Sequence, residues 1–398
     1  MAFDAAAEQS KTHFDHIIVG TGFAGLGMAI QLKEDGLNDF VILERAQDVG
    51  GTWRDNRYPG CACDVQSHLY SFSFAQNPNW TRMFAKQGEI WDYLRACSEK
   101  YGLSSHLRYG ADVNGARWDE TLQHWVVTTQ DGRLFTGRVL ISGMGGLSNP
   151  AIPKIKGMES FKGVQFHSAQ WRHDVDLKGK RIAVIGTGAS AIQFVPEIQK
   201  LAGRVDLYQR TPPWIVPKPD RAISAIERTL FKRFPMLQNA YRKAIYWMLE
   251  ARVLGFTVDP RLMKLFEGVA RSHIKRQVQD PALRAKLTPD YTIGCKRILI
   301  SDNYYPALTQ ANVDVITDGV KEIRANSVVT DDGVEREVDV LIWGTGFQAA
   351  DPVPSGVFFG KGGVDILDAW KDGAEAYKGT TMTGFPNLFF IVGPNTGL

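Results

Sequence analysis

The sequence predicts an α/β fold with two Rossmann-like dinucleotide-binding domains. A short apolar run, a glycine-rich turn and a helical pattern follow one another twice along the 398-residue chain. In each copy a charged residue, Glu44 or Arg210, ends the next apolar run, 24 residues after the first glycine of the turn. Apolar residues make up 44% of the chain and charged residues 22%. These ordinary values exclude a wholly disordered chain.

The first copy begins with the apolar run 16–20, which suits a buried parallel strand. A GxGxxG turn follows it and opens a helical pattern that stops at Gly36. In such turns the first glycine permits the tight bend, the second admits the pyrophosphate and the third lets helix and strand pack closely. The helix N-terminus supplies N–H groups to the anion. We therefore expect a dinucleotide at Gly20, Gly22, Phe23, Ala24 and Gly25.

The second copy begins with the run 181–186 and carries alanine where the third glycine would stand. The same reasoning predicts a second dinucleotide on this turn. A strand-turn-helix without a ligand is the alternative interpretation of either copy. The residues expected at the second site are Thr187, Gly188, Ala189, Ser190, Ala191 and Gln193.

The two charged residues separate the two ligands. Glu44 can accept hydrogen bonds from a ribose diol and repels a 2′-phosphate, whereas Arg210 pairs with a 2′-phosphate. The first site is thus predicted to bind FAD or NAD, and the second NADPH. One chain with both sites indicates hydride transfer from a nicotinamide to a flavin.

Composition shifts predict the domain organisation. We expect residues 1–145 and 330–398 to form a discontinuous FAD-binding domain, and residues 146–329 to form the NADPH-binding domain. The apolar run 338–347 is expected to be a strand that returns to the first domain, and 385–393 a further buried strand. Residues 142–163, rich in glycine and proline, read as the crossing between domains.

A helical insertion is expected at 221–290. Residues 221–289 contain 14 Lys or Arg and 5 Asp or Glu, which is strongly basic for a chain whose net charge is only +3. Solvated basic helix faces, contact with an anionic membrane surface and attraction of NADPH are three explanations that stay open. The balanced overall charge argues against nucleic acid as a partner.

Four irregularly spaced cysteines support neither a zinc site nor a disulfide framework. A reducing, cytoplasmic location therefore fits best. Cys61 and Cys63 suggest a disulfide reductase as an alternative, but a ring with one intervening residue would be badly strained. No apolar run reaches the roughly 18 residues of a membrane span.

The segment 161–171 contains the pattern FxGxxxHxxxW, formed by Phe161, Gly163, His167 and Trp171. Flanked by two GxGxxG-type turns, it resembles the fingerprint of the flavin-dependent (type I) Baeyer–Villiger monooxygenases, class B flavoprotein monooxygenases. Arg172 departs from the family pattern, which continues with Pro or Asp. Further family patterns, in the expected order, are Gly50-Gly51-Thr52-Trp53, Tyr58-Pro59-Gly60, Asp64 and Cys295-Lys296-Arg297.

The resemblance implies roles for these residues. Arg297 would be the permanent cation of catalysis, and Asp64 would orient it and also contact the cofactors. Lys296 would join Arg210 and Thr211 at the 2′-phosphate of NADPH. The FxGxxxHxxxW residues would form a hinge that couples domain rotation to nicotinamide binding. The residues implied for FAD, besides the first turn, are Glu44, Arg45, Thr52, Trp53, Asp64 and Tyr70.

The resemblance also implies a reaction. FAD and NADPH would be the cofactors, and one oxygen of O2 would be inserted next to a ketone carbonyl through a C4a-peroxyflavin, giving an ester or lactone. The alternatives are an amine or sulfide flavin monooxygenase, and an uncoupled NADPH oxidase or non-catalytic flavin-binding fragment. In relatives, a flavin-facing helix and an NADPH loop follow the turn 393–398, so the first domain is expected to be truncated there.

Overall fold

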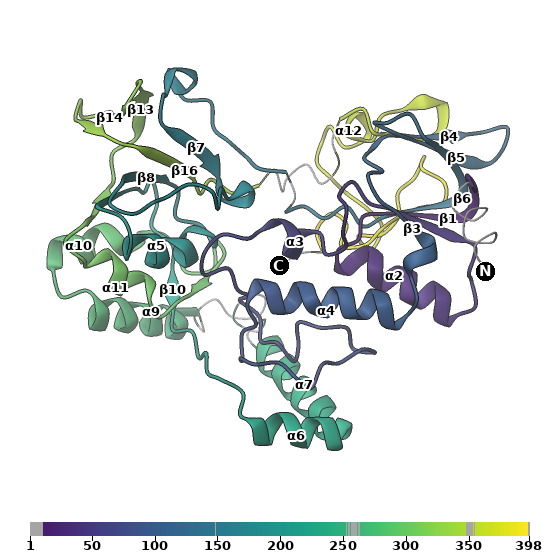
Figure 1. The fold of residues 1–398 in the computed structure, drawn as a ribbon, viewed down its shortest axis with the longest axis horizontal. Coiled ribbons are helices and arrows are strands. Elements are labelled where there is room, and N and C mark those ends of the chain that lie inside the picture. The colour runs from purple at the N-terminus through teal and green to yellow at the C-terminus, as the bar shows by residue number, and fades with distance from the viewer. Residues whose placement is uncertain are drawn as a thin grey trace. The chain divides into compact units, whose positions relative to one another are not determined.

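The computed structural model describes residues 11–147, 149–251, 253, 255, 261, 263–347, 353 and 355–396. The chain divides into two compact units. Unit 1 comprises Met1–Asp55, Ile90–Asn149 and Phe347–Leu398, and unit 2 comprises Asn56–Glu89 and Pro150–Gly346. Figure 1 shows the sheets and helices of each unit. Residues 1–10 of the predicted first domain, and Gly397 and Leu398 at the predicted truncation, lie outside the described residues.

Unit 1 is built on one eight-stranded sheet in which β6 joins two kinds of pairing. Strands β6, β1, β2 and β3 are parallel neighbours in that order, and β18 pairs with β6. Strands β4, β5 and β6 form an antiparallel meander, with β17 at its edge. The bounds are β1 His13–Val19, β2 Phe40–Leu43, β3 Leu107–Arg108, β4 Val113–Asp119, β5 His124–Thr129, β6 Leu134–Ser142, β17 Phe358–Phe359 and β18 Leu388–Phe390.

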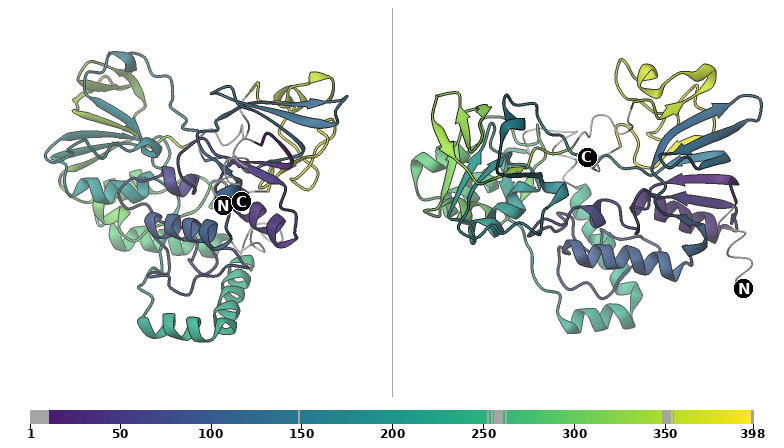
Figure 2. Two further views of the ribbon diagram at one scale, coloured as in Figure 1. Left: turned by 45° about the vertical axis from the view of Figure 1, so that its right-hand side comes forward. Right: turned by 45° about the horizontal axis from the view of Figure 1, so that its top comes forward.

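Helix α2 follows the first glycine turn and packs against the parallel strands β1 and β2 (Figures 1 and 2). Helix α2 begins directly after Gly22 and buries Leu26, Ala29 and Ile30. This buried helix face matches the apolar strands, since residues 17–19 of β1 and all of β2 are also buried. The helices are α2 Phe23–Glu34, α3 Thr52–Asp55, α4 Gln87–Lys100, α12 Ile366–Ala369 and the 3-10 turns η1 Ser104–His106 and η5 Lys361–Gly363.

Unit 2 contains a fully parallel five-stranded sheet in the order β12-β9-β8-β16-β7. The expectation that the run 338–347 returns to the first domain is wrong, because β16 pairs with β7 and β8 of this sheet. An apolar strand indicates burial but not which sheet it joins. The expected strand 385–393 does lie in unit 1, as β18. The bounds are β7 Val164–His167, β8 Arg181–Ile185, β9 Arg204–Tyr208, β12 Val313–Ile316 and β16 Val340–Trp343.

Helices and two small sheets complete unit 2. Helix α5 contains Pro196 and has nine residues, against twelve in α2. The remaining helical elements are α5 Ala191–Gln199, α6 Ala225–Arg233, α7 Pro235–Glu250, α9 Met263–Gln277, α10 Pro281–Leu287, α11 Tyr304–Leu308, η2 Met158–Ser160 and η3 Ser168–Gln170. The additional strands are β10 Ile215–Val216, β11 Leu299–Ile300, β13 Val320–Ile323, β14 Ser327–Thr330 and β15 Glu335–Glu337.

The segment 56–89 belongs to unit 2, although the sequence assigned it to the FAD-binding domain. Its backbone is tied to that unit by a hydrogen bond from the N–H of Met83 to the carbonyl of Arg221, at 2.9 Å. Arg82 also forms an ion pair with Asp220 at 2.9 Å. These partners lie far apart in the sequence, so composition alone does not reveal them.

In the described part of the expected insertion 221–290, the structure contains helices α6, α7, α9 and α10. Residues 252, 254, 256–260 and 262 of this region lie outside the described residues. Among the helices that are described, none combines the length and apolar character needed to cross a membrane.

Candidate functional site

The first glycine turn, between β1 and α2, is shaped by backbone contacts at two of its glycines. Gly20 has φ +96°, and a Cβ there would lie 2.7 Å from the carbonyl oxygen of Gly143. A Cβ at Gly25 would lie 1.9 Å from the carbonyl oxygen of Gly20. At Gly22 the nearest protein atom would be the Cα of Gly51, 4.0 Å away. The fold therefore requires glycine at the first and third positions, and the second leaves the space that a pyrophosphate needs.

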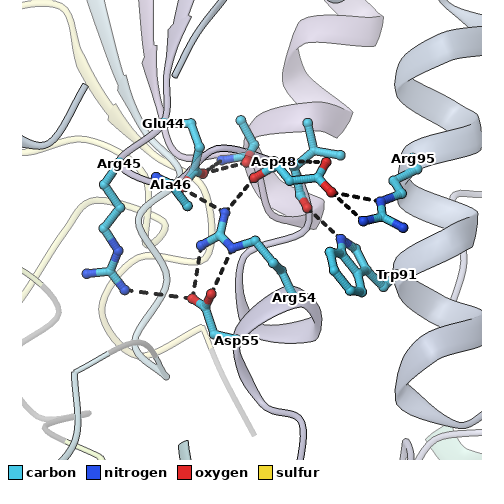
Figure 3. A network of polar contacts seen from close by, with 10 residues as sticks. Glu44, Arg45, Ala46, Asp48, Arg54, Asp55, Trp91 and Arg95 are labelled. Carbon is cyan, nitrogen blue, oxygen red and sulfur yellow. Dashed lines mark hydrogen bonds and ion pairs between the residues drawn. The ribbon is translucent and has the colours of Figure 1, made fainter. Parts of the chain in front are cut away.

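Glu44 follows β2 and lies beside this turn, as predicted, with a buried side chain. Its carboxylate accepts hydrogen bonds from the backbone N–H of Thr21 at 3.1 Å and of Ala46 at 2.9 Å. The Thr21 hydroxyl is a third donor. Arg54 of α3 completes the set with an ion pair at 2.8 Å (Figure 3). A carboxylate offers about four acceptor sites, and these four donors occupy them, so a ribose hydroxyl would replace one of the donors.

Arg54 is the residue at this turn that the sequence did not indicate. Burial opposes its charge, but hydrogen bonding to Asp55 and the charges of Glu44 and Asp55 raise its pKa. Arg45, predicted to contact FAD, is exposed and lies 3.8 Å from the Asp55 carboxylate. The polar network continues to Asp48, which pairs with Arg95 of α4 (Figure 3). A glutamate and an arginine ten residues apart carry no recognisable spacing signal.

The remaining residues expected at FAD divide between the two units. Thr52 and Trp53 form the start of α3 in unit 1, and the Trp53 side chain is buried. Asp64 and Tyr70 belong to unit 2. Their contact with FAD stays a prediction.

The second glycine turn, between β8 and α5, repeats the geometry of the first. Gly186 has φ +108°, and a Cβ there would lie 2.3 Å from the carbonyl oxygen of Gly344, which follows β16. A Cβ at Gly188 would meet no described protein atom within 4 Å. Ala191 takes the third position and is fully buried at the start of α5. The free space again lies at the second glycine, as binding of a pyrophosphate requires.

Cations gather near this second turn. The Thr187 hydroxyl donates to the carbonyl of Thr211 at 3.3 Å, which brings the end of β9 to the glycine turn. The Tyr291 hydroxyl donates to the next carbonyl, that of Pro212, at 3.2 Å. The Lys296 ammonium lies 4.8 Å from the centre of the Tyr291 ring. Lys296 is thus placed close to the segment that carries Arg210, and both cations are exposed.

Gln193 does not use its side chain at the glycine turn. Its amide oxygen accepts from the N–H of Ala62 and from the Tyr58 hydroxyl, each at 3.2 Å. Its amide nitrogen donates to the carbonyl of Ala62 at 3.0 Å. A Cβ at Gly60 would lie 2.5 Å from the Gln193 carbonyl oxygen. Gln193 therefore fixes the segment 58–62 onto α5, and direct contact with NADPH stays a prediction.

Arg297 and Asp64 are brought together, as expected, although 233 residues separate them. The Arg297 guanidinium donates to the Asp64 carboxylate, and its side chain remains 57% exposed. Lys218 is a neighbour that the sequence did not indicate, and its ammonium donates to the carbonyl of Cys63 at 3.4 Å. Burial lowers the pKa of Lys218, against the opposing charges of Asp220 and Asp64.

The four residues of the FxGxxxHxxxW pattern have defined positions around β7. His167, the buried last residue of β7, accepts a hydrogen bond from the Ala169 N–H at 3.1 Å. The Trp171 ring packs against Phe194 of α5, with ring centres 5.3 Å apart. Phe161 is buried, and a Cβ at Gly163 would lie 2.5 Å from a backbone oxygen of the neighbouring loop. The pattern thus joins the sheet to α5, and its hinge role stays a prediction.

Cys61 and Cys63 are free, buried thiols. Burial raises the pKa of each thiol to about 12, against the opposing charge of Lys218. Both sulfurs are therefore protonated at neutral pH, whereas disulfide chemistry needs a thiolate. The geometry gives no support to the disulfide-reductase alternative.

Comparisons with known proteins identify the class. The chain belongs to the flavin-binding monooxygenase-like family, whose model matches residues 15–355. It is 60% identical over 394 residues to a Baeyer–Villiger monooxygenase of Pseudomonas aeruginosa, covering 99% of this chain and 74% of that protein.

Two solved structures resemble this chain closely. Cyclohexanone monooxygenase from Rhodococcus sp. Phi1 bound to NADP+ matches with a TM-score of 0.86 and 28% identity, over 97% of this chain and 80% of that one. The OTEMO complex with FAD and NADP matches with a TM-score of 0.85 and 29% identity, over 97% and 81%. These matches confirm the expected α/β fold class with two Rossmann-like domains, the enzyme class and the cofactors FAD and NADPH.

Proposed function

We propose that this enzyme inserts one oxygen atom of O2 next to a ketone carbonyl, with unit 1 binding FAD and unit 2 binding NADPH. The observation that supports this most directly is the ion pair of Asp64 with Arg297, next in sequence to Lys296, which lies over the Tyr291 ring. Bound FAD, reduced by NADPH, supplies the activation of dioxygen. The protein supplies position, charge and exclusion of water.

In this proposal the first glycine turn binds FAD and the second binds NADPH. The space above Gly22 receives the FAD pyrophosphate, and Glu44 and Thr21 border the adenosine ribose. The space above Gly188 receives the NADPH pyrophosphate. Arg210 and Lys296, with the Thr211 segment, bind the 2′-phosphate through charge-assisted hydrogen bonds.

Arg297 is proposed as the catalytic residue because the ketone oxygen gains negative charge as the carbonyl is attacked. A guanidinium remains protonated at any working pH, so it can stabilise that charge throughout the reaction. Asp64 is proposed as its positioning residue, since its carboxylate accepts a hydrogen bond from the guanidinium. The ketone and O2 are the proposed small-molecule partners, and the four free cysteines fit a cytoplasmic location.

The test is product analysis with Arg297→Ala. Loss of one preorganised charge predicts ester formation slower by roughly a hundredfold or more. NADPH should still reduce the flavin, so its oxidation would continue with release of hydrogen peroxide. Arg297→Lys should recover part of the ester, and Arg276→Ala, an exposed arginine on α9, should behave as wild type. Undiminished ester formation by Arg297→Ala would show that this assignment is wrong.

The second candidate is an amine or sulfide monooxygenase, since the two nucleotide turns suit both reactions. The Arg297–Asp64 pair favours the ketone, because a cation stabilises an oxyanion. Assays with one cyclic ketone, one linear ketone and one sulfide separate the candidates. Oxidation of the sulfide alone would favour the second.

A further inference from the structure

The helices α6 and α7 of unit 2 form a hairpin (Figures 1 and 2), and its inner face packs on the segment 68–71 of the same unit. Tyr241 of α7 and Phe231 of α6 pack edge-on against the buried His68, with ring centres 5.4 and 4.9 Å away. Arg242 donates to the carbonyls of His68, Leu69 and Ser71 at 2.8–3.1 Å. These contacts fix which side of each helix faces outward.

The outward side of the hairpin is apolar. Met236 and Trp247 are 85% and 66% exposed, and they lie eleven residues apart, which places them on one stripe of α7. Other large apolar side chains extend this surface along both helices. We call the surface the outer face; its apolar residues are Ile226, Leu230, Met236, Leu237, Trp247 and Met248.

The two helices that form the outer face also carry exposed cations. Lys232, Arg233 and Lys243 are exposed on the two helices. The two helices contain five Lys or Arg and two acidic residues, Glu227, which forms an ion pair with Arg221 at 2.7 Å, and Glu250 at the end of α7. The hairpin therefore carries a net positive charge next to its apolar stripe. Contiguous exposed apolar side chains beside polar and charged residues are characteristic of an interaction site.

We propose that the outer face docks on an anionic lipid surface. An apolar stripe with a large aromatic residue enters the boundary between headgroups and acyl chains, and flanking Lys and Arg contact lipid phosphates. The charge decides between this partner and a second copy of the chain. A two-fold pairing places the same patch on both partners, so the cations of two outer faces would oppose one another. Docking would bring the enzyme to apolar ketones dissolved in the bilayer.

The experiment is co-sedimentation of the full chain with vesicles. One set contains phosphatidylcholine alone, and the other contains equal parts of phosphatidylcholine and phosphatidylglycerol. We expect wild type to sediment with the anionic vesicles and to be released by high salt. The double variant Met236→Ser, Trp247→Ser should lower the partition coefficient by roughly tenfold or more, because two large apolar side chains no longer insert.

A charge variant and a control complete the design. Lys232→Glu with Arg233→Glu should abolish the preference for anionic vesicles. Leu122→Ser, at an apolar residue of unit 1 that is 58% exposed, should bind as wild type. Oxidation of NADPH with a water-soluble ketone and no vesicles should be unchanged in every variant, which shows that they fold. Equal binding by wild type and the outer-face variants would overturn the proposal. So would a wild-type dimer that these substitutions dissociate.

Discussion

The two glycine turns share one backbone design but differ in the charged residue that borders them. At the first turn the buried Glu44 is surrounded by donors of the protein itself, including the cation of Arg54. At the second, Arg210 and Lys296 remain exposed. The first turn is thus preorganised around an internal ion pair, whereas the second presents cations to solvent. The first turn therefore suits a cofactor that stays bound. The second turn suits a phosphorylated coenzyme that binds and is released in each catalytic cycle.

The largest expected effect is a loss of stability on replacing the first glycine of a turn, which replacing the second glycine should not cause. Gly186→Ala places a Cβ against the Gly344 carbonyl at a left-handed φ, so we expect it to lower the free energy of unfolding by roughly 4 kcal/mol. Gly188→Ala places its Cβ in open space and should leave stability unchanged while raising the KM for NADPH. Urea unfolding and steady-state kinetics measure the two effects. Equal stability of the two variants would contradict the shared design.

Removing Arg54, the cation of the first turn, should lower the free energy of unfolding almost as much. Arg54→Met leaves the buried Glu44 carboxylate without its ion-pair partner, and we expect a loss of about 3 kcal/mol in unfolding free energy. Adding Glu44→Gln to that variant removes the charge and should restore part of the loss. A double-mutant cycle by chemical denaturation measures this coupling. Simple additivity would mean that the ion pair does not organise the turn.

At the second turn the expected effect is on coenzyme choice rather than on stability. Arg210→Glu replaces attraction of the 2′-phosphate by repulsion, so the preference for NADPH over NADH in kcat/KM should fall by roughly a hundredfold. Lys296→Ala should lower it by roughly tenfold. Arg233→Glu, an exposed cation on α6, is the control. A preference that survives Arg210→Glu would place the 2′-phosphate elsewhere.

The smallest expected effect is a pH dependence of stability that comes from His68, in the segment of unit 2 that carries Asp64. The pKa of His68 is lowered from 6.5 to about 4, first because burial disfavours the imidazolium; Arg221 adds to the shift and Glu227 opposes it. Between these values the unfolded chain binds a proton that the folded chain does not, so stability falls as pH falls through this range. We expect a loss of about 2 kcal/mol.

His68→Phe keeps the ring contacts and should remove this pH dependence. Unfolding free energies at pH 7 and pH 4.5 measure it, and His124→Phe in unit 1 serves as the control. An unchanged pH dependence in His68→Phe would assign the titration to another group.

Local patterns were enough to predict both turns, their strands and the following helices. The order of apolar run, glycines and helix is a local signal, and so is the 24-residue spacing to Glu44 and Arg210. The pairing of Arg297 with Asp64 came from motif resemblance. The sheet that β16 joins could not be predicted, because a buried apolar strand looks the same in either unit.

Partners brought together by folding were also invisible in the sequence. Arg54 acts on Glu44 only because a one-turn helix carries it back to the first turn. Gln193 was expected at NADPH, but its amide is used by the Ala62 backbone. Arg242 binds three carbonyls more than 170 residues earlier in the chain. Such contacts depend on the tertiary structure, and no spacing of residues in the sequence predicts them.

We propose that unit 1 binds a flavin and that unit 2 binds the phosphorylated nicotinamide that reduces it. Anaerobic mixing of the purified protein with NADPH or NADH, followed by flavin absorbance, tests this most directly. We predict a yellow protein that NADPH bleaches much faster than NADH, with the order reversed in Arg210→Glu. A colourless protein that takes up no flavin would contradict the flavin site of unit 1, and faster bleaching of wild type by NADH would contradict the NADPH site of unit 2.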